Sequence, residues 1–179
     1  MTVGDAWIFL KPWSAAKSEA APRRLLAGAE VEERVAVLLG LEGLHDLEAE
    51  ISLRPWLDGL EMSGWVKGVA LRLCGLTLEP LEESVDEAVL VRLLPEGSPN
   101  APLSVGQEVV IDLEADDPPE MVTGDVINLG AYLVEAFGLG LEPFPRKTGA
   151  VFEAPETGAA LSPFAVLKAL RPGVGNGGS

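Results

Sequence analysis

Residues 47–78, LEAEISLRPWLDGLEMSGWVKGVALRLCGLTL, decide the fold of this chain. From Leu47 to Leu53 apolar residues alternate with polar ones, which is the two-residue period of a strand with one buried face. Asp58 and Gly59 form a turn signal, and the run that follows is rich in Val, Leu and Trp. Glycines interrupt this second run, so a bent or bulged strand is favoured over a helix. The stretch therefore predicts a long antiparallel hairpin.

Further strands are predicted on both sides of this hairpin. Val85 to Leu94 continues the alternation and supplies a third antiparallel partner, and Gln107 to Leu113 has the composition of a further strand. Near the N-terminus, Trp7 to Leu10 has the pattern of a short buried strand ended by Pro12, and Ser14 to Arg24 is typical of a connector. The predicted sheet is mostly antiparallel, and the pattern leaves open whether it closes into a barrel.

Helical patterns flank the strands. Residues 30–39 place apolar side chains on one face, and Gly40 suits a glycine C-cap. Asn128 is predicted to cap a second helix, which Pro143 prevents from continuing. A third short helix is predicted to begin at Ser162. The apolar stripe of the second helix consists of Leu129, Leu133, Val134 and Phe137. Strands in the middle and two or three packed helices near the ends predict an α+β domain.

Charge is the strongest global feature of the sequence. The 179 residues include 28 acidic and 13 basic side chains, which gives a formal net charge of −15. Such a surface attracts cations and repels phosphate backbones at long range. Solubility is the simplest explanation of the charge, and a basic protein partner is the more specific one. Tight binding to nucleic acid would need a concentrated cluster of Arg and Lys.

Several classes of protein are disfavoured by the sequence. Its charge-free runs fall far short of the roughly 20 apolar residues that span a bilayer. Residues 1–14 lack the basic start and the cleavage pattern of a secretory signal, so we expect a cytoplasmic protein that does not contact membranes. Cys74 is the only cysteine, which excludes an internal disulfide and a multi-cysteine zinc site.

The sequence contains little of the chemistry that enzymes use. Its single histidine, His45, is expected in a loop, and no nucleophile or phosphate-binding motif accompanies it. The acidic run from Glu114 to Glu120 has carboxylates for a metal site or a paired-acid site, but its spacing fits no Ca²⁺ loop. Two prolines in that run favour a solvated loop. We therefore expect no catalytic residue, no metal, no cofactor and no small-molecule substrate.

Four motifs occur in a characteristic order. Residues 74–80 read CGLTLEP, residues 125–130 read DVINLG, residues 141–146 read LEPFPR, and residues 162–167 read SPFAVL. Together they resemble the YceD-like family, whose members carry a strand-ending Cys-x-x-[Cys or Thr]-Leu-Glu-Pro motif and, in one branch, Leu-[Asp or Glu]-Pro-[Tyr or Phe]-Pro-Arg. The resemblance covers roughly residues 30 to 170.

This resemblance implies a role in the accumulation, processing or stability of large-subunit ribosomal RNA, without catalytic residues. The expected organisation is a strand and connector at 1–28, a YceD-like α+β domain at 29–170, and a flexible tail at 171–179, which is predicted from its glycine content. Thr77 stands where many members have a second cysteine, which removes a redox or metal argument, and Asn128 stands where aspartate is common. The motif residues, with structural or interaction roles, are Cys74, Thr77, Glu79, Pro80, Pro143, Phe144, Pro145 and Arg146.

Two interpretations of the LEPFPR motif remain open. In the first, Arg146 pairs with the Glu79 carboxylate, while the two prolines hold an extended path that presents Phe144 to the core. In the second, Arg146 and Lys147 contact an RNA phosphate and Phe144 or Trp65 stacks on a base. For the cysteine of the other motif, we expect burial as a small apolar side chain, with a reactive thiol as the alternative.

The function expected from these observations is that of a non-enzymatic accessory protein in ribosome biogenesis. It would support large-subunit ribosomal RNA through a basic ribosomal or rRNA-processing protein. Direct RNA binding through the Arg146 region is the alternative within the same pathway. The other classes considered are an acidic protein-interaction module outside ribosome assembly and a hydrolase that uses paired carboxylates.

Overall fold

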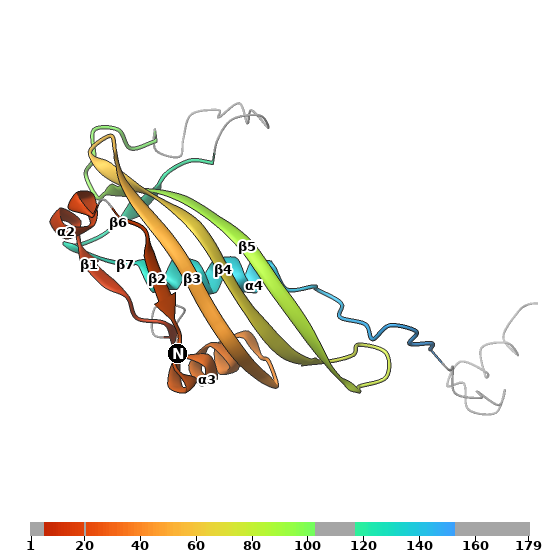
Figure 1. Cartoon of the computed structure of the whole chain (residues 1–179). Helices are drawn as coiled ribbons and strands as arrows, with labels where there is room; N and C mark the ends of the chain where they lie inside the picture. Colours follow the sequence, from red (N-terminus) through yellow and green to blue (C-terminus); the bar gives the residue numbers. More distant parts are fainter. Residues whose placement is uncertain (1–5, 20, 103–116, 153–179) are drawn as a thin grey trace, which may run out of the picture.

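A five-stranded sheet forms the centre of the computed structural model, which describes residues 6–19, 21–102 and 117–152. The strand order is β2-β3-β4-β5-β6, and only the β5–β6 pair is parallel. The three long strands lie side by side as one twisted layer (Figure 1). The strands are β2 (Arg23–Leu26), β3 (Gly43–Trp56), β4 (Gly59–Leu73), β5 (Pro80–Pro95) and β6 (Glu120–Val122).

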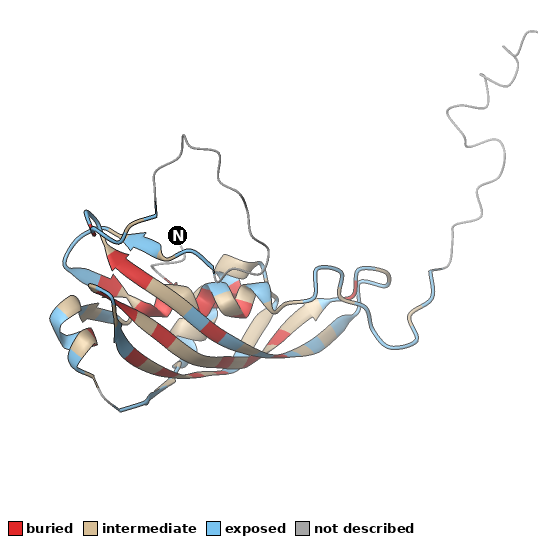
Figure 2. Ribbon diagram, turned by 90° about the horizontal axis from the view of Figure 1, so that it is seen from above, coloured by how far each residue is buried: buried red, intermediate tan, exposed pale blue. Residues whose placement is uncertain are grey.

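Three helices and a small second sheet complete the described structure. The helices are α2 (Trp13–Ser18), α3 (Ala29–Leu39) and α4 (Leu129–Leu139), and the second sheet pairs β1 (Leu10–Pro12) with β7 (Val126–Asn128). Helix α4 packs against β4 and β5, and buried residues recur along the long strands and on this helix (Figure 2). The fold is α+β with a mostly antiparallel sheet, as predicted, and this sheet is open and not closed into a barrel.

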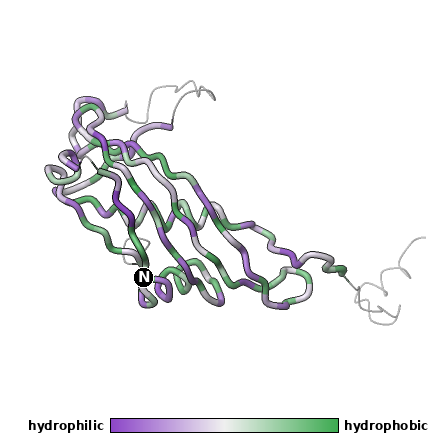
Figure 3. Tube along the Cα trace, viewed as in Figure 1, coloured by the Kyte–Doolittle hydropathy of each residue, from purple (hydrophilic) through white to green (hydrophobic). Residues whose placement is uncertain are grey.

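The β3–β4 hairpin forms as the alternation predicts. Leu47, Ala49, Ile51 and Leu53 are buried, with more exposed residues between them. Figure 3 shows the corresponding alternation of hydrophobic and hydrophilic residues along the strands. The two strands of the hairpin approach each other closely at Gly64. Gly64 has a φ of +157°, and a Cβ there would lie 1.9 Å from the Glu50 carbonyl oxygen.

The predicted helix ends are also confirmed. Gly40 ends α3 in the left-handed conformation, with a φ of 67°. The Asn128 side chain accepts a hydrogen bond from the Gly130 N–H at 3.2 Å and another from the Phe9 N–H at 3.0 Å. This cap therefore also ties α4 to the N-terminal segment. The predicted apolar stripe of α4 is buried throughout.

The N-terminal prediction was wrong in detail. The strand begins at Leu10 and includes Pro12, which is tolerated because β1 pairs on one side only, with β7. The expected connector contains α2 and β2, because Ala16 is buried in the core and Arg23 to Leu26 pair with β3. Both elements depend on contacts with distant parts of the chain, which a local sequence pattern cannot indicate.

Two further boundaries differ from expectation. Pro80 begins β5 instead of ending the preceding strand, since β4 stops at Leu73. His45 lies within β3, beside an irregularity in the β3–β4 pairing, and not in a loop. The predicted strand at 107–113, the helix from Ser162 and the tail at 171–179 lie outside the described residues. No described helix is both long enough and apolar enough to span a membrane.

Candidate functional site

The CGLTLEP motif forms the connection between β4 and β5. The Cys74 N–H donates to the Glu79 carbonyl at 2.8 Å, and the Leu78 N–H donates to the Cys74 carbonyl at 2.9 Å. Leu78 adopts a φ of 59°, which turns the chain back toward β5. The Thr77 hydroxyl lies 3.2 Å from a Glu79 carboxylate oxygen. The motif is therefore a hydrogen-bonded turn in which the side chains of Thr77 and Glu79 form a hydrogen bond with each other.

The LEPFPR motif lies against this turn. The Gly75 N–H donates to the Pro145 carbonyl at 2.8 Å, and the Lys147 N–H donates to the Cys74 sulfur at 3.4 Å. The Lys147 ammonium is 3.3 Å from the Glu79 carboxylate. Segments about 70 residues apart in sequence thus meet at one end of the β4–β5 hairpin. We call the Cys74–Pro80 turn and residues 141–147 together the motif junction.

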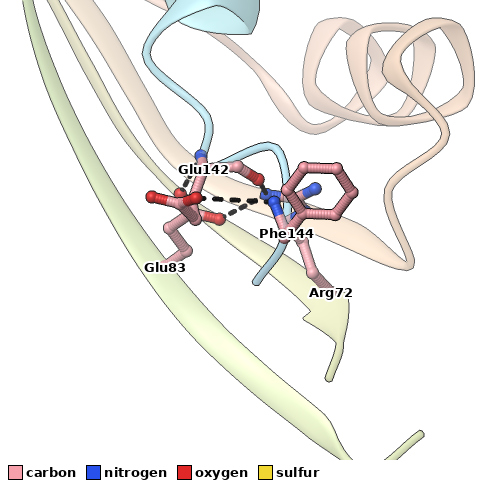
Figure 4. Close-up of polar contacts among 4 residues, drawn as sticks. All are labelled: Arg72, Glu83, Glu142 and Phe144. Carbon is pink, nitrogen blue, oxygen red and sulfur yellow. Dashed lines mark hydrogen bonds and ion pairs between the residues drawn. The ribbon is translucent and has the colours of Figure 1, made fainter. Parts of the chain in front are cut away.

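An ion pair beside the turn holds the start of the 141–147 segment (Figure 4). Arg72 Nη1 donates to Glu83 Oε2 at 2.6 Å and to the Glu142 carbonyl at 2.7 Å. The other oxygen of Glu83 accepts from the Glu142 N–H at 2.6 Å. The side chains of Arg72 and Glu83 are only 18% and 17% exposed, so the pair is shielded from much of the solvent. Arg72 of β4 and Glu83 of β5 therefore both bind the backbone of Glu142.

Removal of Arg72 is expected to destabilise the protein. Arg72→Ala leaves the poorly exposed Glu83 carboxylate without its cation, and we expect the free energy of unfolding to fall by about 2 kcal/mol. Urea unfolding followed by circular dichroism measures this change. Lys67→Ala is the control, because its pair with Asp86 is 43% and 66% exposed and should contribute less than about 1 kcal/mol. Equal losses in both variants would contradict a structural role for the Arg72 pair.

Two predictions about the LEPFPR motif were wrong. The Glu79 carboxylate pairs with Lys147, whereas Arg146 is exposed and makes no ion pair with any residue in the described ranges. Neighbouring side chains of an extended segment point in opposite directions, so only one of the two cations can face the turn. Phe144 is 76% exposed instead of packed in the core. The chain is held on both sides of Phe144, because the Glu142 carbonyl accepts from Arg72 and the Pro145 carbonyl accepts from the Gly75 N–H.

Cys74 is buried, as expected, but it lies outside the hydrophobic core cluster. Its sulfur accepts a hydrogen bond from the Lys147 N–H. The Lys147 N–H, together with donors from Thr77 and Leu76, lowers the pKa of the Cys74 thiol from 9.0 to about 6. Hydrogen bonds to the thiolate favour the charged form, which explains the direction of the shift. The cysteine of the motif thus helps to hold residue 147 on the turn.

This shift predicts a pH-dependent contribution to stability. The folded protein loses the Cys74 proton near pH 6, whereas the unfolded chain keeps it until about pH 9. The unfolded state binds more protons within this window, so the contribution rises with pH and disappears below the folded pKa. We expect the stability difference between wild type and Cys74→Ser to grow from about pH 5 to about pH 8.5. A pH-independent difference in urea unfolding would contradict the thiolate assignment.

The other candidate residues do not assemble into a catalytic centre in the described ranges. His45 Nδ1 lies 2.9 Å from the carboxylate of its neighbour Asp46, which raises the pKa of the histidine. Glu114 and Asp116 lie outside the described residues, while Glu120 belongs to β6 and bonds to Tyr132. Within the described ranges, no group of three or more His, Cys, Asp or Glu side chains could hold a metal ion.

Sequence reasoning missed a groove between β5 and α4. Its volume is about 720 Å³, and Asp117, Pro118 and Glu120 contribute to its lining. The other lining residues come from one strand and one helix: Glu87, Ala88, Val89, Leu90, Val91, Arg92, Tyr132, Glu135, Ala136 and Leu139. Helix α4 and β5 are adjacent only in the fold, so no local pattern could reveal the groove.

Most cations in the described ranges are already engaged by carboxylates of the same chain. Arg54 and Arg146 are exposed and have no such pair among the residues described. Lys17 donates to the Asp58 carbonyl. The paired cations are Lys11, Arg23, Arg24, Arg34, Lys67, Arg72, Arg92 and Lys147. The described part of the surface therefore offers few unpaired positive charges.

Known proteins offer no further guide to the role of these sites. No family model, curated protein or solved structure matches the chain. The likeness to the YceD-like family remains a resemblance carried by the motifs.

Proposed function

We propose that this protein is a non-enzymatic accessory factor in ribosome biogenesis. It supports the accumulation, processing or stability of large-subunit ribosomal RNA in the cytoplasm, and it acts through a basic ribosomal or rRNA-processing protein. The connection to ribosomal RNA comes from the motif resemblance. The mode of action comes from the distribution of charge on the folded chain.

The pairing of the cations is the observation that supports this mode of action. Arginine and lysine side chains that hold carboxylates of their own chain have less to offer a phosphate backbone. Acidic residues outnumber basic ones by 28 to 13, so many carboxylates have no cation of the same chain to pair with. A surface of this kind steers basic partners toward the protein and repels nucleic acid.

Direct RNA binding through the motif junction is the second candidate. The exposed Arg146 is close in sequence to the exposed ring of Phe144, and a cation beside an aromatic ring suits a nucleotide. Against this, Arg72 and Lys147 at the same junction are already paired with glutamates. A single unpaired arginine does not form the basic groove that tracks a phosphate backbone.

Affinity purification of the full chain at moderate salt, with and without RNase, tests the proposal against this rival. We expect recovery of large-subunit ribosomal or rRNA-processing proteins that survives RNase. Recovery that RNase abolishes would favour direct RNA contact, and recovery of neither would contradict both.

Arg146→Gln sharpens the comparison. Arg54→Gln is its matched control, because Arg54 is also exposed and without an ion pair among the described residues. Our proposal predicts that neither substitution reduces the RNase-resistant recovery. A loss of RNA-dependent recovery in Arg146→Gln alone would assign RNA binding to the motif junction.

A further inference from the structure

Within the part of the chain that the structure describes, the edge of β5 opposite β4 is unpaired over most of its length. Strand β4 pairs with it from Pro80 to Leu93, whereas β6 pairs with the opposite edge only from Leu93 to Pro95. Among the described residues, no strand and no backbone hydrogen bond occupies that edge between 81 and 92. Its N–H and C=O groups form a row that can pair with another extended chain.

The groove lies along this same edge. Val89 and Ala136 contribute buried and half-buried apolar surface, while Leu90 and Leu139 are 62% and 80% exposed. An added strand would place alternate side chains toward α4, within reach of Val89, Ala136 and Leu139, and the others toward the opposite face, where Leu90 is exposed. An added strand could thus pair its backbone with β5 and place its side chains in the groove.

The charges around the groove are mostly negative. Glu87, Asp117, Glu120 and Glu135 line it, and Arg92, the one cation among the described lining residues, pairs with Glu61 at 3.1 Å. Burial and the carboxylates of Glu120 and Glu135 raise the pKa of Tyr132. An extended segment that carries lysine or arginine would meet complementary charge here.

Charge disfavours the two other sources of a strand. A second copy of the chain would bring a net charge of −15 against a surface of the same sign. Residues 103–116 of this chain carry four acidic side chains and no basic one: Glu108, Asp112, Glu114 and Asp116. Both would place like charges along the groove.

We propose that the open edge of β5 and the groove beside α4 bind an extended basic segment of a partner protein, which adds to the sheet as a further strand. Lysine or arginine side chains of this segment face the carboxylates of the groove on the side of α4, and the alternate apolar side chains cover Leu90 on the opposite face of the sheet. The inference rests on the proposed function, because it gives the basic partner a binding site and a conformation.

A synthetic peptide in which lysine and valine alternate, labelled with fluorescein, tests this site by fluorescence anisotropy with the full chain. We expect saturable binding, weakened about tenfold by Glu135→Lys. Glu33→Lys on α3 is the matched control: both glutamates are exposed, and both substitutions change the net charge equally. Equal effects of the two substitutions would overturn the assignment to the groove.

The conformation of the bound segment needs its own test. The same peptide with alternate backbone nitrogens methylated keeps its charges but loses the donors needed for strand pairing, and we expect it not to bind. Undiminished binding of this peptide would overturn strand addition.

Hydrogen exchange measured by NMR provides a further check. The amides between 81 and 92 on the open edge should gain protection when the unmethylated peptide binds. Full protection of these amides in the free protein would overturn the proposal, because residues 103–116 or a second copy would already occupy the edge.

Failure of this inference is distinguishable from failure of the proposed function. If the peptide does not bind but loss of the protein still lowers large-subunit ribosomal RNA, the groove is not the binding site and the proposed function stands. If the peptide binds and ribosomal RNA is unchanged, the groove serves a basic partner outside ribosome assembly.

Discussion

Phe137→Ala is expected to lower the free energy of unfolding by about 3 to 5 kcal/mol. Phe137 is fully buried on α4, and its ring occupies the space above Gly68 of β4, where a Cβ would lie 2.9 Å from a ring carbon. Removal of the ring leaves a cavity between the helix and the sheet, which a hydrogen-bonded sheet cannot readily fill.

Urea unfolding of Phe137→Ala, compared with Leu139→Ala, measures this effect. Leu139 is on the same helix and 80% exposed, so its truncation should cost less than about 0.5 kcal/mol. Gly68→Ala should destabilise the wild type but not Phe137→Ala, because the clash partner is then absent. Additive losses would contradict the packing of α4 on β4.

Gly64→Ala is expected to cost about 3 kcal/mol. At its φ of +157° an alanine is strained, and its Cβ would lie 1.9 Å from the Glu50 carbonyl oxygen of the paired strand. The backbone oxygen cannot move without breaking the β3–β4 pairing. The variant should therefore unfold at a lower urea concentration than the wild type.

Gly43→Ala is the matched control for this substitution. It lies in β3, its φ is not in the left-handed region, and its nearest contact would be 3.6 Å from a Leu71 side-chain carbon. We expect a change within about 0.5 kcal/mol. A Gly64→Ala variant as stable as Gly43→Ala would contradict the close approach of Gly64 to the Glu50 carbonyl.

The parts of the fold that could be predicted are those with a local cause. Alternation between Leu47 and Leu53 indicated a half-buried strand, and Asn128 indicated the start of α4 because its side chain can cap the first turn. The pairing of β1 with β7 could not be predicted. It joins segments more than 100 residues apart, and its strands are too short to show a period.

The candidate site could likewise be predicted only where its cause is local. The two motifs were identifiable in the sequence, but which cation reaches Glu79 depends on the side of an extended segment that faces the turn. Lys147 faces it, and Arg146 does not. The hydrogen bonds that join Arg72, Glu83 and Glu142 could not be predicted, because they form only when residues 141–147 lie against the β4–β5 hairpin.

The ratio of large-subunit to small-subunit ribosomal RNA after loss of this protein tests the central claim most directly. Our account predicts that large-subunit RNA falls relative to small-subunit RNA, and that the wild-type chain restores the ratio. Arg146→Gln should restore it as well, because the proposed action does not use an arginine–phosphate contact. An unchanged ratio after loss of the protein would contradict a role in supporting large-subunit ribosomal RNA.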